Sequence, residues 1–108
     1  MSSRLDRKHG WERLAAQCDY RVEEMARRCQ VSTRQLERHF LALFKKTPKR
    51  WMDEVRAHAA LQEMARGESV KATATGLKFK HASSFTRFFK RVKGATPTKF
   101  KPPDVANS

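Results

Sequence analysis

One stretch of the chain, residues 32–45, carries side chains that can form directional hydrogen bonds with the edges of nucleic-acid bases. Arg34, Glu37 and Arg38 are three and four residues apart, so a helix places them on one face. A guanidinium can donate two hydrogen bonds to O6 and N7 of guanine, and a carboxylate can accept one from N4 of cytosine. The opposite face of this helix is apolar and consists of Leu36, Phe40, Leu43 and Phe44. We expect the apolar face to be buried and the charged face to be free to meet DNA.

The same pattern occurs twice in the chain, at residues 22–44 and 70–92. A shift of 48 residues places Val22 on Val70, and after one inserted residue a shift of 49 places Arg38 on Arg87. Such an internal repeat indicates one supersecondary unit used twice. The unit predicted from its periodicity is a helix, a short turn and a second helix.

The composition indicates a polyanionic partner. The chain has 24 Lys and Arg against 11 Asp and Glu, a formal net charge of +13 and a pI near 10.6. No apolar run approaches the ~20 residues that cross a bilayer, and there is no secretory leader pattern. We therefore predict a soluble, cytoplasmic protein with no membrane partner. Cys18 and Cys29 lie in apolar helical patterns, where free thiols pack as small hydrophobic groups.

Residues for catalysis or metal binding are not grouped in the sequence. The four histidines, His9, His39, His58 and His81, have no carboxylate or Cys at ligand spacing, and no Gly-rich phosphate loop is present. The sequence therefore predicts no enzyme, no metal site and no cofactor.

The elements that must position these residues are predicted to be helices. Apolar periodicity indicates seven helical segments and no convincing strand, at about 10–18, 22–29, 32–45, 47–67, 69–77, 81–93 and a short one from 96. Cap residues mark the boundaries: Ser32 with Gln35, Thr47 before Pro48, Ser69, Gly67 and Gly94. We predict an all-α fold comprising a flexible arm (1–9), a first helix-turn-helix lobe (10–46), a linker helix (47–67), a second helix-turn-helix lobe (68–101) and a disordered tail (102–108).

Three segments together carry a resemblance to a known family. The run Ala-x-x-Cys-x-Val-Ser-x-x-x-Leu-x-Arg-x-Phe from Ala26 to Phe40, the Pro48 helix with Arg56, and the run from Phe79 to Lys90 followed by Gly-x-x-Pro resemble the AraC/XylS-type DNA-binding domain. The resemblance covers about residues 11–101. It implies two homeodomain-like helix-turn-helix units whose last helices enter successive major grooves of double-stranded DNA. Regulators of this type activate transcription by contacting RNA polymerase near the promoter.

The resemblance also implies roles for individual residues. The positions that read bases are Arg34, Glu37, Arg38, Ala82, Ser83 and Arg87. Residues placed for backbone phosphates are Ser32, Thr33, Lys45, Lys80, His81, Ser84 and Lys90. Among the base-reading residues of the second unit, Ala82, Ser83 and Arg87, only Arg87 can fork onto a base. We therefore expect the first unit to read sequence more sharply, and the second to depend on phosphates, DNA shape and a thymine methyl against Ala82.

Some residues depart from the family pattern. Gln30 and Lys78 stand where family members commonly have a Gly in the left-handed turn, at a cost on the order of 1 kcal/mol each. In the helix after Ser69, Thr73 replaces a large aliphatic residue and Gly76 lies inside the helix, so we expect a weaker second lobe. Glu63 stands where an apolar residue is usual. Phe88 is expected to point partly outward.

Alternatives remain open at this point. A nonspecific architectural or RNA-binding protein would account for the charge, although it would not account for the repeat or the capping box. The chain has no sensing or dimerising domain before residue 10, so both a stand-alone regulator and the DNA-binding end of a larger one fit it. We expect a monomer, associated with the nucleoid.

Overall fold

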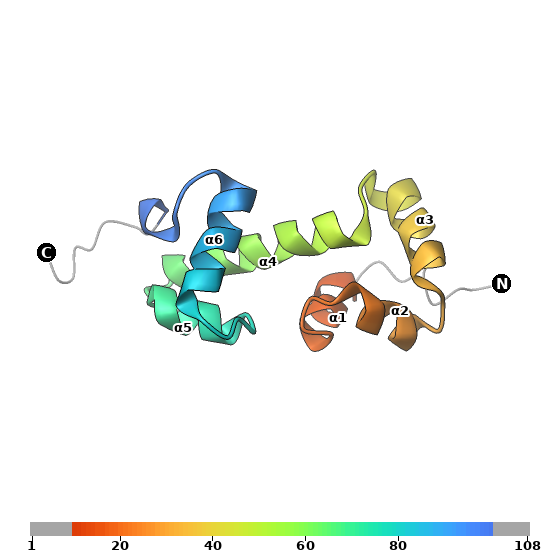
Figure 1. Ribbon diagram of the computed structural model, residues 1–108, viewed down its shortest axis with the longest axis horizontal. Helices are drawn as coiled ribbons and strands as arrows, with labels where there is room; N and C mark the ends of the chain where they lie inside the picture. Colours follow the sequence, from red (N-terminus) through yellow and green to blue (C-terminus); the bar gives the residue numbers. More distant parts are fainter. Residues whose placement is uncertain (1–9, 101–108) are drawn as a thin grey trace, which may run out of the picture. The chain divides into compact units, whose positions relative to one another are not determined.

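The computed structural model describes residues 10–100, so the arm and tail predicted at 1–9 and 102–108 lie outside the described part. Residues 10–100 form six α-helices, one 3-10 helix and no strand, which confirms the all-α prediction (Figure 1). The elements are α1 (Trp11–Gln17), α2 (Val22–Cys29), α3 (Thr33–Phe44), α4 (Pro48–Ala65), α5 (Val70–Gly76), α6 (Ala82–Lys93) and η2 (Pro97–Lys99). None of these helices has the length and apolar character needed to cross a membrane.

The chain divides into two compact units, and the division falls inside α4, between Val55 and Arg56. In the first unit, α2 packs against α3 and the core gathers around Phe40. The Phe40 ring meets Trp11 and Trp51 edge-on, with centroid distances of 4.8 and 5.2 Å. The buried core residues of this unit are Trp11, Ala15, Cys18, Met25, Ala26, Cys29, Leu36, Phe40, Trp51 and Met52. Cys18 and Cys29 are both buried and form no disulfide, as predicted, and burial raises the pKa of Cys18.

The second unit contains the later part of α4 together with α5, α6 and η2. Here α5 and η2 both pack against α6, and the buried hydrophobic residues are Ala57, Ala60, Met64, Ala74, Leu77, Phe85, Phe88 and Phe89. The Phe89 ring lies 5.7 Å from Phe85 and meets Phe100 edge-on at 5.3 Å. Buried aromatic side chains on α6 therefore fix which side of this helix faces inward.

The helix boundaries follow the caps read from the sequence. The Thr47 hydroxyl accepts from the Arg50 backbone N–H at 3.2 Å, with Pro48 at the first helical position. The Ser69 hydroxyl accepts from the Ala72 N–H at 3.0 Å. At the other end of α6, Gly94 has φ +86, the left-handed conformation that a glycine tolerates. The last segment differs from prediction only in being a single 3-10 turn.

Two predictions about side-chain burial are wrong. Leu43, assigned to the core, is 38% exposed, because it lies in the last turn of α3, where the helix ends. Phe88, expected to point partly outward, is only 7% exposed. It lies three residues after Phe85 and therefore on the inner face, where its ring packs 5.2 Å from Phe79.

The two turns adopt the left-handed conformation that the family pattern implies. Gln30 has φ +60 and Lys78 has φ +73. In the second unit Thr73 is buried, and its hydroxyl has no hydrogen-bond partner within residues 10–100. An unpaired buried hydroxyl destabilises a core by ~1–3 kcal/mol. The first unit also contains two buried polar atoms without a partner within residues 10–100, Trp11 Nε1 and His39 Nε2, so this feature does not rank the stability of the two units.

We predict that Gln30→Gly and Lys78→Gly each leave the free energy of unfolding unchanged or raise it by up to ~1 kcal/mol, because glycine adopts positive φ without a Cβ clash. Denaturation in urea measures the change. The matched control is Gln62→Gly in the exposed interior of α4, which should lower stability by ~1 kcal/mol. A loss at Gln30 or Lys78 as large as the loss at Gln62 would contradict the prediction.

Candidate nucleic-acid interface

The first candidate reading helix, α3, begins at a complete capping box. The Ser32 hydroxyl accepts from the Gln35 N–H at 3.0 Å, and the Gln35 side-chain oxygen accepts from the Ser32 N–H at 2.9 Å. Leu36 and Phe40 are fully buried on its inner side. The helix is thus held at its start by the box and along its length by the core, which fixes the side that remains outside.

The outer side of α3 presents the predicted base-reading residues. Arg34, Glu37 and Arg38 are all exposed. Within residues 10–100, none of these three side chains has a hydrogen bond or ion pair with another part of the chain. Their donors and acceptors are therefore available to a ligand without the loss of an internal contact.

The second candidate reading helix, α6, presents an equivalent face with different chemistry. Ala82, Ser83 and Arg87 are exposed, as is Lys90 one turn further on. Arg87 also lacks an internal partner within the described part of the chain. The side chain of the cap residue His81 makes no capping hydrogen bond, so α6 starts without the reciprocal box of α3.

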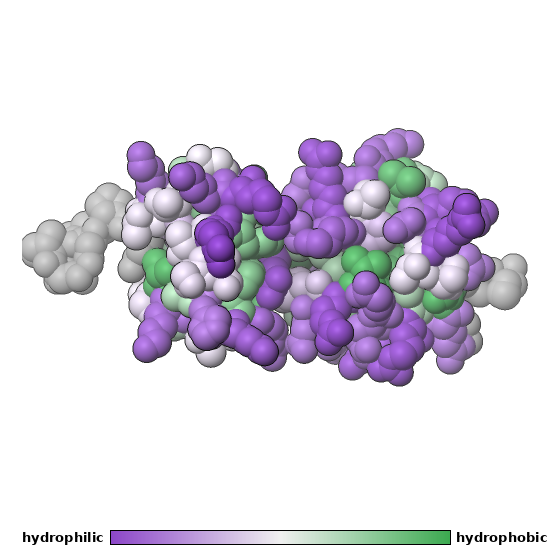
Figure 2. All heavy atoms as spheres, in the orientation of Figure 1, coloured by the Kyte–Doolittle hydropathy of each residue, from purple (hydrophilic) through white to green (hydrophobic). Residues whose placement is uncertain are grey.

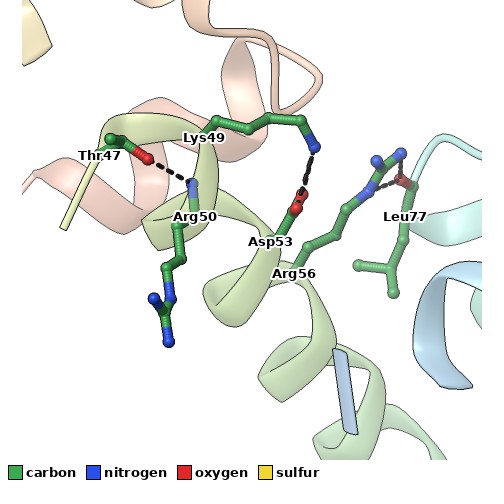
Figure 3. A network of polar contacts seen from close by, with 6 residues as sticks. All are labelled: Thr47, Lys49, Arg50, Asp53, Arg56 and Leu77. Atoms are coloured by element: carbon green, nitrogen blue, oxygen red, sulfur yellow. Dashed lines mark hydrogen bonds and ion pairs between the residues drawn. The ribbon is translucent and has the colours of Figure 1, made fainter. Parts of the chain in front are cut away.

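The turn that leads into α6 is held by Arg56 (Figure 3). Its Nε and Nη2 both donate to the Leu77 carbonyl, at 3.1 and 2.8 Å. Its guanidinium carbon lies 3.7 Å from the centre of the Phe79 ring. Leu77 is the C-cap of α5 and Lys78 is left-handed, so the Arg56 side chain holds both the backbone before the turn and the Phe79 ring after it.

Many of the other cations are paired with carboxylates. Glu24 accepts from Arg27 and Arg28, and these bonds lower its pKa to about 2. Further pairs are Lys46 and Arg50 with Glu54, Lys49 with Asp53, and Arg66 with Glu63. A hydrogen bond from Lys46 is the main cause of the lowered pKa of Glu54. The paired carboxylates therefore belong to α2 and α4, whereas Arg34, Arg38 and Arg87 have no partner within residues 10–100.

The charge is distributed unevenly between the two units. Residues 10–55 contain ten Lys or Arg and seven Asp or Glu, whereas residues 56–100 contain ten and two. From Ser69 to Phe100 there is no acidic residue. Figure 2 shows hydrophilic residues over most of the visible face, with small, separate apolar patches. The second unit is therefore the stronger electrostatic attractor for a polyanion.

The described residues offer little for a metal or a small ligand. Within residues 10–100 there is no group of three His, Cys, Asp or Glu side chains that could hold a metal ion. An open hollow of about 450 Å³ lies at the starts of α2, α3 and α4, lined by Val22, Glu23, Thr33, Glu37, Thr47, Pro48 and Lys49. The N-terminus of α2 carries partial positive charge, which favours the carboxylate of Glu23 in its first turn.

The family comparison agrees with this arrangement. A family model described as a helix-turn-helix domain matches residues 25–102, from within α2 through both reading helices. The chain belongs to the AraC-type helix-turn-helix family. This AraC-type domain is a DNA-binding domain of transcription regulators and not a catalytic family. No curated protein sequence matches the chain.

The structure exposes the predicted contact residues of the AraC-type domain. All six base-reading candidates are exposed, as are Ser32, Thr33, Lys45, Lys80, His81 and Lys90, while Ser84 is half-buried. Sequence reasoning did not single out Leu41 or Thr86. Leu41 is seven residues after Arg34 and 48% exposed, and Thr86 matches Glu37 at the shift of 49. The seven-residue step from Arg34 could have drawn attention to Leu41, and the repeat could have drawn attention to Thr86.

We predict that Arg56→Lys destabilises the second unit by ~1–3 kcal/mol, because lysine keeps the charge but cannot fork onto the Leu77 carbonyl while stacking on Phe79. Circular dichroism in urea follows both units, whereas tryptophan fluorescence follows the first, which holds Trp11 and Trp51. The dichroism transition should shift to lower urea.

The matched control is Arg50→Lys on the same helix, where the arginine is 74% exposed and pairs with Glu54 in solvent. It should change stability by less than ~1 kcal/mol. Equal effects of the two substitutions would show that the Arg56 fork does not hold the turn.

Proposed function

We propose that the chain binds a specific sequence of double-stranded DNA, with α3 and α6 in successive major grooves, and regulates transcription as an activator. The observation that carries the proposal is the pair Arg38 and Arg87. They occupy equivalent places in two repeated units, both are exposed, and neither has an internal partner within residues 10–100. Two unpaired guanidinium groups on helix faces suit the O6 and N7 pair of guanine.

The proposal divides the work between the two units. In the first, Arg34 and Arg38 donate to guanine and Glu37 accepts from cytosine. In the second, Arg87 reads one base and Ala82 contacts a thymine methyl, while Ser83 is too short to fork onto a base. The phosphate contacts come from Ser32, Thr33, Lys45, Lys80, His81, Ser84 and Lys90, which position the protein without selecting a sequence.

Nonspecific nucleic-acid binding is the second candidate. The observation that favours it is the charge of residues 56–100, with ten cations and two acids. Competition with unrelated DNA separates the two functions, because a specific site typically wins by ~10³ or more. Equal competition by all sequences would support the nonspecific function.

The remaining elements of the proposal concern the cellular setting. A promoter-bound activator acts on RNA polymerase, so we propose that enzyme as the second partner and the nucleoid in the cytoplasm as the location. Because each chain holds two reading helices, one monomer suffices for one site.

We predict that the monomer occupies one asymmetric site whose two half-elements lie about one helical turn, roughly 10 bp, apart on the same face of DNA. Selection of bound DNA from a random library, followed by sedimentation of the complex, tests both the sequence and the stoichiometry. A palindromic consensus occupied only by dimers would contradict the prediction.

We predict that Arg38→Ala weakens binding to the selected site by ~1–3 kcal/mol and relaxes preference at one or two base pairs, because a forked contact is lost. Arg34→Ala should behave in the same way. Arg87→Ala should lose affinity with a modest loss of specificity. Lys90→Ala should instead weaken all sequences alike and reduce the salt slope by about one unit.

The measurement is binding of each variant to the site and to its single-base mutants across a salt series. The matched control is Arg38→Lys, which keeps the charge without the fork and should therefore lose base preference with little change in salt slope. If Arg38→Ala lost affinity evenly over all sequences while Lys90→Ala changed base preference, the assigned roles would be wrong.

A further inference from the structure

A large apolar side chain lies within the charged face of α3. Leu41 is 48% exposed, and it is seven residues after Arg34 and three after Arg38. Steps of three, four and seven residues return to the same side of a helix, so Leu41 continues the line of these two arginines. A single exposed leucine is ordinary on a protein surface. The position of this one, along a row of unpaired arginines, calls for an explanation.

The other exposed leucine of α3 provides an internal comparison. Leu43 is 38% exposed, but it lies roughly 200° around the helix from Leu41, next to the buried side marked by Leu36 and Phe40. Leu43 therefore lies on the buried side of α3, in the last turn of the helix, where the packed core ends. Leu41 lies roughly 100° around the helix from Phe40 and about 140° from Leu36, away from the buried side, so its exposure has a different origin.

The repeat gives a second, independent comparison. The shift of 49 that places Arg38 on Arg87 also places Leu41 on Lys90, which is exposed on α6. The two helices thus carry different chemistry at the same step: an apolar group in the less charged unit and a cation in the more charged one. A lysine suits a phosphate, whereas a leucine has no hydrogen bond to offer either to a phosphate or to a base.

We infer that Leu41 is a specificity-determining residue that packs against the C5 methyl group of a thymine, next to the base pair met by Arg38. This inference rests on the proposed function. The thymine methyl is the apolar group that base edges present in the major groove. Leu41 lies about 4.5 Å along the helix axis from Arg38, close to the ~3.4 Å step between base pairs. A cytosine there would place a polar amino group against the leucine, so the contact selects thymine.

A second copy of the chain fits this surface less well. Arg34 and Arg38 flank Leu41, and within residues 10–100 no carboxylate pairs with either of them. Glu37 is the one acid beside these two arginines, so two such faces would still bring an excess of cations together around one leucine contact. DNA supplies both the negative charge for the arginines and the methyl group for the leucine.

The test removes the methyl group alone. In the selected site, each thymine is replaced in turn by deoxyuridine, which keeps all base-pairing groups but lacks the C5 methyl. Binding of wild-type protein and Leu41→Ala is then measured on every version. The replacement at the Leu41 contact should weaken the wild-type protein about fourfold, as expected for one methyl group returned to water, whereas a replacement at the Ala82 contact should weaken wild type and Leu41→Ala alike. The replacement at the Leu41 contact should leave Leu41→Ala unchanged.

Leu43→Ala is the matched control, because it removes the same atoms from the same helix on another side. It should keep the wild-type response to every deoxyuridine. Circular dichroism confirms that each variant is folded, which the exposure of both leucines favours. If Leu41→Ala and wild-type protein respond alike to every replacement, the inference is overturned. It is overturned as well if Leu41→Ala binds DNA normally and instead loses self-association in sedimentation.

The controls separate this inference from the proposed function. If wild-type protein shows no preference for any selected site over unrelated DNA, the proposed function fails and the inference fails with it. If preference and its dependence on Arg38 are present but no thymine methyl is sensed through Leu41, only the inference fails.

Discussion

The burial of one aromatic residue in each of α3 and α6, the candidate reading helices, is the constraint on which their exposed faces depend. Phe40 and Phe89 occupy equivalent places in the repeat, and both are fully buried. An α-helix has a single rotational setting that buries such a residue, so the side chains on the opposite side are fixed outside. Arg38 and Arg87 are each two residues earlier, roughly 200° around the helix. The core therefore determines which residues DNA can meet, although no core residue needs to touch it.

The two units satisfy this constraint by different means. The first closes around a cluster of Trp11, Phe40 and Trp51 and starts α3 with a reciprocal capping box. In the second, the start of α6 has no side-chain cap, and the preceding turn is fastened by the fork of Arg56. Arg56 thus has a structural role, in a unit whose other Lys and Arg side chains, among residues 56–100, are exposed. The distinction matters because mutation of Arg56 would affect DNA binding through the fold and not through contact.

The sequence predicted elements well and the extent of burial less well. Caps are local, since Ser32, Thr47 and Ser69 each bond a backbone group three residues away, and all three were foreseen. Periodicity gives the angle of a side chain around a helix but not the point where the packed surface ends, which is why Leu43 and Phe88 were misassigned. The bond from Arg56 to Leu77 spans 21 residues and depends on tertiary packing, so no local pattern indicated it. The base-reading roles were assigned by resemblance and the phosphate roles from residue type and position, and both stay predictions, because exposure shows availability and not contact.

The uneven charge of the two units bears on how such a protein would find its site. On the proposed function, the second unit attracts any duplex through its positive charge. Electrostatic contacts that do not depend on sequence let a protein slide along DNA. The first unit, with nearly as many acids as bases, adds little to that attraction, so it can sample one sequence after another during a slide. Residence on DNA then depends more on the second unit, and choice of sequence more on the first. Added salt would therefore shorten the time spent sliding on DNA more than it would change the sequence at which sliding stops.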